Sequence, residues 1–128
     1  MPLPPLSLAV VGADFPNKRG PTRRFEIAVC PPGEPVELRP EPKNPADPRA
    51  VAVFSVRGVQ LGYLSAERCG RIGALIRSGR AVTAIFQEAT SYGAVIRVAF
   101  DGNEPALPPA REPQAEQDWW PDPEWPEE

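Results

Sequence analysis

Four cationic side chains lie within seven positions of one another, and their chemistry suits the binding of phosphate. They are Lys18, Arg19, Arg23 and Arg24. Ammonium and guanidinium groups pair with phosphate oxygens, and such contacts supply much of the affinity of proteins for a nucleic-acid backbone. The alternative is a solvated loop without a ligand. The sequence therefore offers a candidate phosphate-binding rim, which the neighbouring elements must position.

The sequence contains few of the residue types on which catalytic sites commonly depend. The chain has no histidine and two cysteines, Cys30 and Cys69, which excludes a His/Cys zinc site, a Ser-His-Asp triad and a Cys-His pair. Glu41 and Asp47 stand without a nucleophile or a set of metal ligands. We therefore expect no enzymatic activity, no metal and no cofactor. The cysteines are expected in the core, although a single disulfide between them stays open.

Charge and proline divide the chain unequally. Residues 1–100 hold 13 Lys and Arg against 8 Asp and Glu, whereas residues 101–128 hold one Arg against nine acids. None of the 19 prolines falls between Arg49 and Glu104. Because proline interrupts helices and central strands, that stretch is the expected heart of the fold. Residues 1–5 are expected to be a flexible N-terminus, and residues 101–128 a disordered, proline-rich acidic tail.

Alternating apolar residues predict a domain of mainly β structure over residues 6–100. The expected strands are 6–13, 23–30, 36–39, 50–56, 60–64, 81–88 and 94–100. Ser65 and Gly79 are typical of the start and end of a helix, which would bury Cys69, Ile72, Leu75 and Ile76. Five strands, one helix and two further strands in so short a chain predict a small, strongly curved or closed barrel. The aromatic residues expected in its core are Phe25, Phe54, Tyr63, Phe86 and Phe100.

One motif is specific enough to suggest a family. Residues 41–53 read Glu-Pro-Lys-Asn-Pro-Ala-Asp-Pro-Arg-Ala-Val-Ala-Val, and residues 58–64 read Gly-Val-Gln-Leu-Gly-Tyr-Leu before the predicted helix. This pattern resembles the HIRAN domain over about residues 6–100, and it is similar to the free-standing bacterial type. The resemblance implies an OB-like barrel associated with DNA repair and replication. The best-studied HIRAN domains bind the 3′ end of single-stranded DNA.

The resemblance also implies roles for individual residues. It matches Asp47 with an acid that contacts the terminal 3′-hydroxyl, Asn44 with an asparagine beside the end-binding pocket, and Phe15 with a base-stacking aromatic residue. Two positions depart from the pattern, since Ala46 replaces a tyrosine and Asp14 replaces an arginine. Asn and Asp beside proline also cap turns, and this second reading of Asn44 and Asp47 stays open.

Taken together, these features predict a non-enzymatic DNA-binding module for single-stranded or 3′-end-containing DNA, accessory to repair or replication. Phosphate contacts would come from the cationic rim, and Tyr92, at an expected hairpin tip, would add a second stacking residue to Phe15. No stretch has the roughly 20 apolar residues of a membrane span, so we expect a cytoplasmic, bacterial protein with no membrane partner, and association with the nucleoid stays open.

A protein-interaction adaptor is the alternative. All three tryptophans, at positions 119, 120 and 125, lie among acids in the tail. Tryptophan is enriched at binding hot spots, so the tail could recruit a repair or helicase protein while the barrel serves as scaffold. The same acidic aromatic segment could instead occupy the basic body of its own chain.

Overall fold

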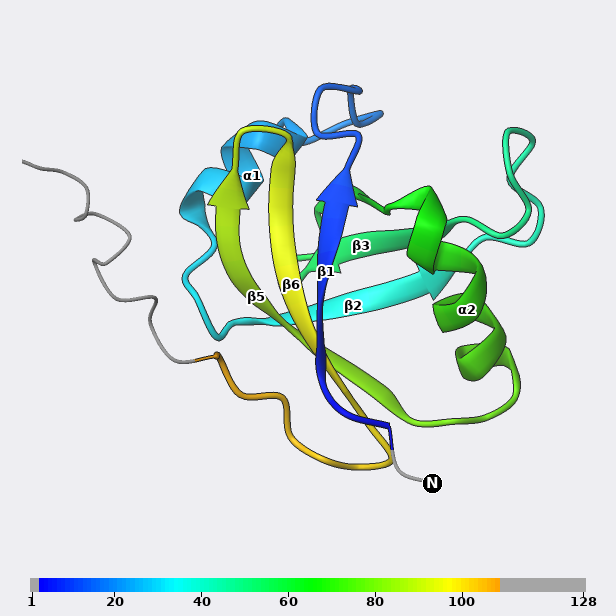
Figure 1. Cartoon of the computed structure of the whole chain (residues 1–128). Helices are drawn as coiled ribbons and strands as arrows, with labels where there is room; N and C mark the ends of the chain where they lie inside the picture. The colour runs from blue at the N-terminus through cyan, green and yellow to red at the C-terminus, as the bar shows by residue number, and fades with distance from the viewer. Residues whose placement is uncertain (1–2, 109–128) are drawn as a thin grey trace, which may run out of the picture.

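Six antiparallel strands close into one barrel in the computed structural model, which describes residues 3–108 (Figure 1). Around the barrel the order is β1-β4-β3-β2-β5-β6. The strands are β1 (Leu6–Val11), β2 (Pro35–Pro40), β3 (Val51–Ser55), β4 (Gln60–Leu64), β5 (Val82–Thr90) and β6 (Gly93–Phe100), and the helices are α1 (Arg23–Val29) and α2 (Ala66–Arg77). The prediction of a small closed barrel of mainly β structure is confirmed.

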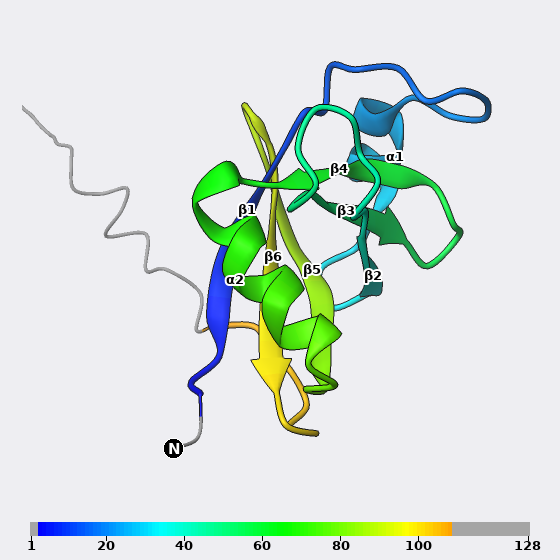
Figure 2. The ribbon, with the colours of Figure 1, turned by 90° about the vertical axis from the view of Figure 1, so that its right-hand side faces the viewer.

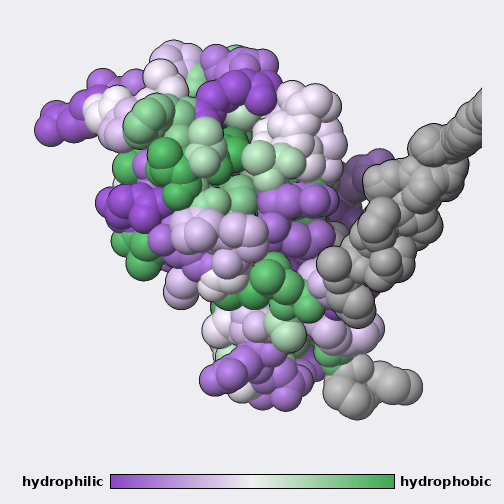
Figure 3. Space-filling model, turned by 90° about the vertical axis from the view of Figure 1, so that its left-hand side faces the viewer, coloured by the Kyte–Doolittle hydropathy of each residue, from purple (hydrophilic) through white to green (hydrophobic). Residues whose placement is uncertain are grey.

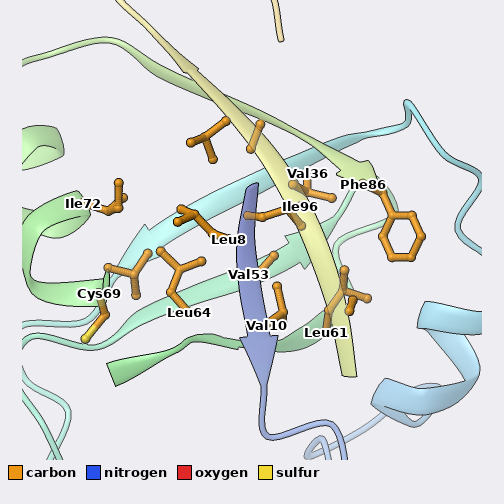
Figure 4. Packing of buried hydrophobic residues seen from close by; sticks show 14 of the residues in the cluster. Leu8, Val10, Val36, Val53, Leu61, Leu64, Cys69, Ile72, Phe86 and Ile96 are labelled. Atoms are coloured by element: carbon orange, nitrogen blue, oxygen red, sulfur yellow. The ribbon is translucent and has the colours of Figure 1, made fainter. Parts of the chain in front are cut away.

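The core fills the barrel with alternate side chains of its strands. Leu8 and Val10 of β1, Val53 of β3 and Leu61 of β4 are almost completely buried and lie close together (Figure 4). From outside the sheet, α2 adds its buried face, which includes Ile72, to the same cluster. The expected boundaries of this helix are confirmed within two residues. Both cysteines are free and buried, and burial raises the pKa of the Cys30 thiol to about 11.

Two glycines let β1 lie close to both of its neighbours. Gly62 of β4 has a φ of 155° and Gly93 of β6 a φ of 153°. A Cβ atom at Gly62 would come within 2.3 Å of the Val11 carbonyl oxygen, and one at Gly93 within 2.3 Å of the Val10 carbonyl oxygen. Any larger residue would therefore push β1 away from β4 or β6 at the point where the barrel closes. This constraint explains the glycine of the Gly-Tyr-Leu motif.

The predicted strand 23–30 is wrong, because this segment forms α1. Thr22 caps the helix, since its hydroxyl accepts a hydrogen bond from the Phe25 backbone N–H at 3.1 Å. Of the alternating apolar residues that suggested a strand, only Ile27 is buried, whereas Phe25 is 58% and Val29 46% exposed. The buried face of the helix consists of Arg23, Glu26 and Ile27, followed by Cys30. The expectation that Phe25 belongs to the core is therefore also wrong.

Glu26 explains how α1 can bury an acid. The residue is only 2% exposed. Its carboxylate accepts hydrogen bonds from the Ser55 hydroxyl at 2.7 Å and the Arg57 guanidinium at 2.6 Å. Arg57 also pairs with Glu34 at 2.9 Å. A buried carboxylate is tolerated when its charge is paired and its oxygens are hydrogen-bonded. These contacts hold α1 against β3 and the turn that follows it.

The two ends of the described chain contact the barrel. Leu3 packs against the core, although the sequence suggested a flexible N-terminus over residues 1–5. Asp101 pairs with Arg80 at 2.6 Å, and the Asn103 carbonyl accepts a hydrogen bond from the Thr83 hydroxyl at 3.2 Å. The remainder of the expected tail, residues 109–128 with the three tryptophans, lies outside the described residues. Neither helix of residues 3–108 is long and apolar enough to cross a membrane.

Candidate nucleic-acid interface

A cleft of about 900 Å³ opens between the loop after β1 and the loop after β2. Both loops lie at the upper end of the barrel in two perpendicular views (Figures 1 and 2). Phe54 of β3 and Tyr63 of β4 line the cleft beside the loops. Both aromatic residues are half-buried rather than part of the core, which corrects the expectation from the sequence. The other charged and amide side chains of the lining are Asn17, Lys18, Arg19, Arg23, Glu41, Lys43, Asn44 and Gln60.

Arg23 joins the segments that form one side of the cleft. Although charged, it is only 7% exposed. Its guanidinium donates to the Gly12 carbonyl and to the Asn17 side-chain oxygen, both at 2.9 Å, and lies 5.7 Å from the centroid of the Tyr63 ring. Asn17 in turn donates to the Gln60 carbonyl at 3.2 Å. Arg23 therefore fixes the loop after β1 over β4, and two of its five N–H donors are used in doing so.

Glu41 organises the opposite side of the cleft. One carboxylate oxygen accepts hydrogen bonds from the Tyr63 hydroxyl and the Asn44 side-chain amide, each at 2.9 Å. The Asn44 side-chain oxygen accepts from the backbone N–H groups of Ala46 at 2.8 Å and Asp47 at 3.2 Å. The capping role of Asn44 that the sequence left open is therefore present, and it lines the cleft as well.

Asp47 caps the next part of the same loop. One of its oxygens accepts from the Arg49 backbone N–H at 2.8 Å and from the Arg49 guanidinium at 3.3 Å. The backbone hydrogen bond, followed by the side-chain contact, holds the pKa of Asp47 below its ordinary value. Asp47 is absent from the residues that line the cleft. The turn-capping reading thus describes the contacts of Asp47 in the structure.

Three exposed aromatic side chains follow directly, in the sequence, the residues that Arg24 brings together. Arg24 donates to the Asp14 carboxylate at 2.6 Å and to the Ser91 carbonyl at 3.1 Å, so it joins the loop after β1 to the β5–β6 hairpin. The pairing lowers the pKa of Asp14. Each of these three residues precedes an exposed aromatic residue in the sequence, namely Phe15 (68%), Phe25 (58%) and Tyr92 (48%). The side of the molecule that carries α1 shows apolar surface bordered by hydrophilic side chains (Figure 3).

The cleft is lined by more cations than acids, and most of these cations are not engaged in ion pairs within residues 3–108. Within residues 3–108, no ion pair involves Lys18, Arg19 or Lys43, whereas Glu41 is engaged by Tyr63 and Asn44. Lys18 and Arg19 are exposed, as expected for a phosphate-binding rim. An electropositive cleft with aromatic rings in its lining matches the general design of surfaces that bind single-stranded nucleic acid.

The cleft contains about half of the site residues expected from the sequence. Lys18, Arg19, Arg23 and Asn44 line it, whereas Phe15, Arg24, Asp47 and Tyr92 do not. Sequence reasoning missed Asn17, Lys43, Phe54, Gln60 and Tyr63 as lining residues. Tyr63 and Lys43 belong to the motif segments and could have been noticed there. Asn17 carries no signal in the sequence, and Gln60, although it belongs to the second motif segment, does not reveal its contact with Asn17, because that contact depends on how the loop folds over β4.

Comparison with known proteins identifies the family. The HIRAN domain model matches residues 13–97, two thirds of the chain, and the chain belongs to this family. No curated protein matches the sequence.

Solved structures share the fold. The crystal structure of the HIRAN domain of human HLTF is 22% identical, covers 75% of this chain and 74% of its own, and has a TM-score of 0.61. The HLTF HIRAN domain in its DNA-bound conformation, solved by NMR, is 24% identical with a TM-score of 0.55, and the match covers 78% of this chain and 76% of that one. A Lactobacillus plantarum protein is 18% identical with a TM-score of 0.64, over 73% of this chain and 89% of its own.

Adjacent arginines provide a test of this geometry. We expect Arg23→Ala to lower the free energy of unfolding by about 2 kcal/mol, because the substitution removes two hydrogen bonds of a buried charged group. Arg24→Ala is the matched control and should change stability little, because its ion pair with Asp14 is exposed to solvent. Urea denaturation followed by circular dichroism measures both. Equal effects of the two substitutions would contradict the structural role of Arg23.

Proposed function

We propose that this chain is a non-catalytic module that binds single-stranded DNA in the cleft between the loops after β1 and β2. The observation that carries the proposal is one open cleft that holds both cations and aromatic rings. The cations are Lys18, Arg19 and Lys43, which form no ion pair within residues 3–108, and the rings are those of Phe54 and Tyr63. The cations suit phosphates and the rings suit unstacked bases. The DNA-bound conformation of the similar HLTF HIRAN domain supports the choice of ligand.

Stacking would extend beyond the cleft in this proposal. Phe15 and Tyr92 are exposed aromatic residues on segments that Arg24 holds together. A strand leaving the cleft could place further bases on these rings, each worth about 1–3 kcal/mol in comparable proteins. Membership of the HIRAN family supports an accessory role in DNA repair or replication, in which the domain would hold a strand while another protein acts on it.

The cationic rim yields a direct test. Replacing Lys18 and Arg19 together with alanine should weaken binding to a fluorescently labelled oligonucleotide. The slope of log K against log salt should also shrink by about 1.4, since each lost single-strand phosphate contact contributes about 0.7. Fluorescence anisotropy at several salt concentrations measures both quantities.

Arg68→Ala with Arg71→Ala is the matched control for this experiment. It removes the same charge from α2, outside the cleft, and should leave most of the slope intact. If the α2 pair lowers the affinity and the salt slope more than the rim pair does, the DNA binds at α2 and not in the cleft, which contradicts the proposal.

Recognition of a 3′ end is the finer question within this function. We expect similar affinities for oligonucleotides that end in a 3′-hydroxyl and in a 3′-phosphate. One Asp47 oxygen is already engaged by Arg49, Asp14 is paired with Arg24, and Ala46 offers no ring. Competition between the two oligonucleotides measures the preference. A tenfold preference for the 3′-hydroxyl that Asp47→Ala abolishes would show that this chain recognises strand ends.

A further inference from the structure

A second, smaller pocket lies away from the cleft, between the N-terminal segment, α2 and the end of β6. Its volume is about 150 Å³, and its apolar lining comes from Leu3, Pro4, Leu6, Ile72 and Phe100. An apolar cavity of this size binds benzene in another protein, so the pocket is large enough to take an aromatic ring. The N-terminal segment and the end of β6 lie at the lower end of the barrel, whereas the loops of the cleft lie at the upper end (Figures 1 and 2).

Two arginines complete the lining of this pocket. Arg68 and Arg71 of α2 are exposed, and neither forms an ion pair within the described part of the chain. An apolar pocket bordered by guanidinium groups suits an aromatic ring that is flanked by carboxylates. The ring would gain hydrophobic burial and contact with the cations, and the carboxylates would pair with the arginines. This combination is poorly suited to a bare hydrocarbon ligand or to a phosphate alone.

The chain itself carries a segment of this chemistry beyond Pro108. Residues 118–125 read Asp-Trp-Trp-Pro-Asp-Pro-Glu-Trp, and residues 109–128 hold one Arg against seven Asp and Glu. We propose that this tryptophan-acidic segment docks in cis on the pocket beside Arg68 and Arg71. One indole would enter the apolar pocket while Asp118 or Asp122 pairs with the arginines.

The covalent connection permits this contact. Phe100 lines the pocket, and residues 101–108 continue from it along the barrel, where Asp101 pairs with Arg80. Eleven residues lead from Pro108 to Trp119, and they can span at most about 36–40 Å. This reach exceeds the length of β5, the longest strand, whose nine residues extend about 30 Å. Tethering would also raise the effective concentration of the segment to the millimolar range, so that modest intrinsic affinity suffices.

Tryptophan fluorescence of the full-length chain reports on this contact, because all three tryptophans belong to the proposed ligand. At low salt we expect a blue-shifted emission maximum and protection from acrylamide quenching, relative to a synthetic peptide of residues 109–128. Arg68→Glu with Arg71→Glu should move both values to those of the peptide. Thermal unfolding by circular dichroism verifies that the variant is folded, which we expect because both side chains are exposed.

Lys18→Glu with Arg19→Glu is the matched control, since it makes the same change of charge at the cleft. It should leave the emission maximum and the quenching of the wild type unchanged. If the charge reversal at the cleft gives peptide-like fluorescence and the reversal on α2 does not, the segment occupies the DNA site, and the proposal is overturned. Peptide-like fluorescence of the wild type at low salt would overturn it as well. A blue shift that appears only as dimers form in sedimentation would assign the pocket to a second copy instead.

Discussion

Arg23 is the side chain on which the arrangement of the cleft depends. Its buried guanidinium contacts the Gly12 carbonyl, the Asn17 side chain and the Tyr63 ring, which belong to a loop and a strand that are far apart in the sequence. Burial of a charged group is costly unless its donors are satisfied, so the loop has few other positions open to it. One structural cation thus fixes the place at which the neighbouring cations Lys18 and Arg19 are presented to solvent.

The acids near the cleft are engaged by the protein, and this leaves the cations available. Glu41 accepts from Tyr63 and Asn44, Asp14 pairs with Arg24, and Asp47 caps the backbone of its own loop. Such contacts neutralise or orient the negative charges while Lys18, Arg19 and Lys43 keep theirs free within residues 3–108. Nine of the 17 acids lie in residues 101–128, and the cleft lining has four cations against one acid, so a chain with a net charge of −3 presents an electropositive cleft.

Sequence patterns predicted the barrel and α2 because these elements bury apolar residues at regular spacing. They failed at residues 23–30, where the helix buries Arg23 and Glu26 and exposes Phe25 and Val29. An apolar pattern could not indicate this helix, because two of its buried residues are charged and the partners of Glu26, Ser55 and Arg57, come from a distant hairpin. For the site, charge and motif indicated Lys18, Arg19 and Asn44, whereas Asn17 and Gln60 became visible only once the loop was seen folded over β4.

The central claim is that nucleic acid occupies the cleft rather than another basic surface. Amide chemical-shift mapping of the full-length chain during titration with a short single-stranded oligonucleotide tests it most directly. We predict that the largest shifts fall at the non-proline residues that line the cleft, which are residues 17–20, 23, 41, 43–44, 54, 58–60 and 63. Shifts concentrated on α2, or no shifts at low salt, would contradict the account.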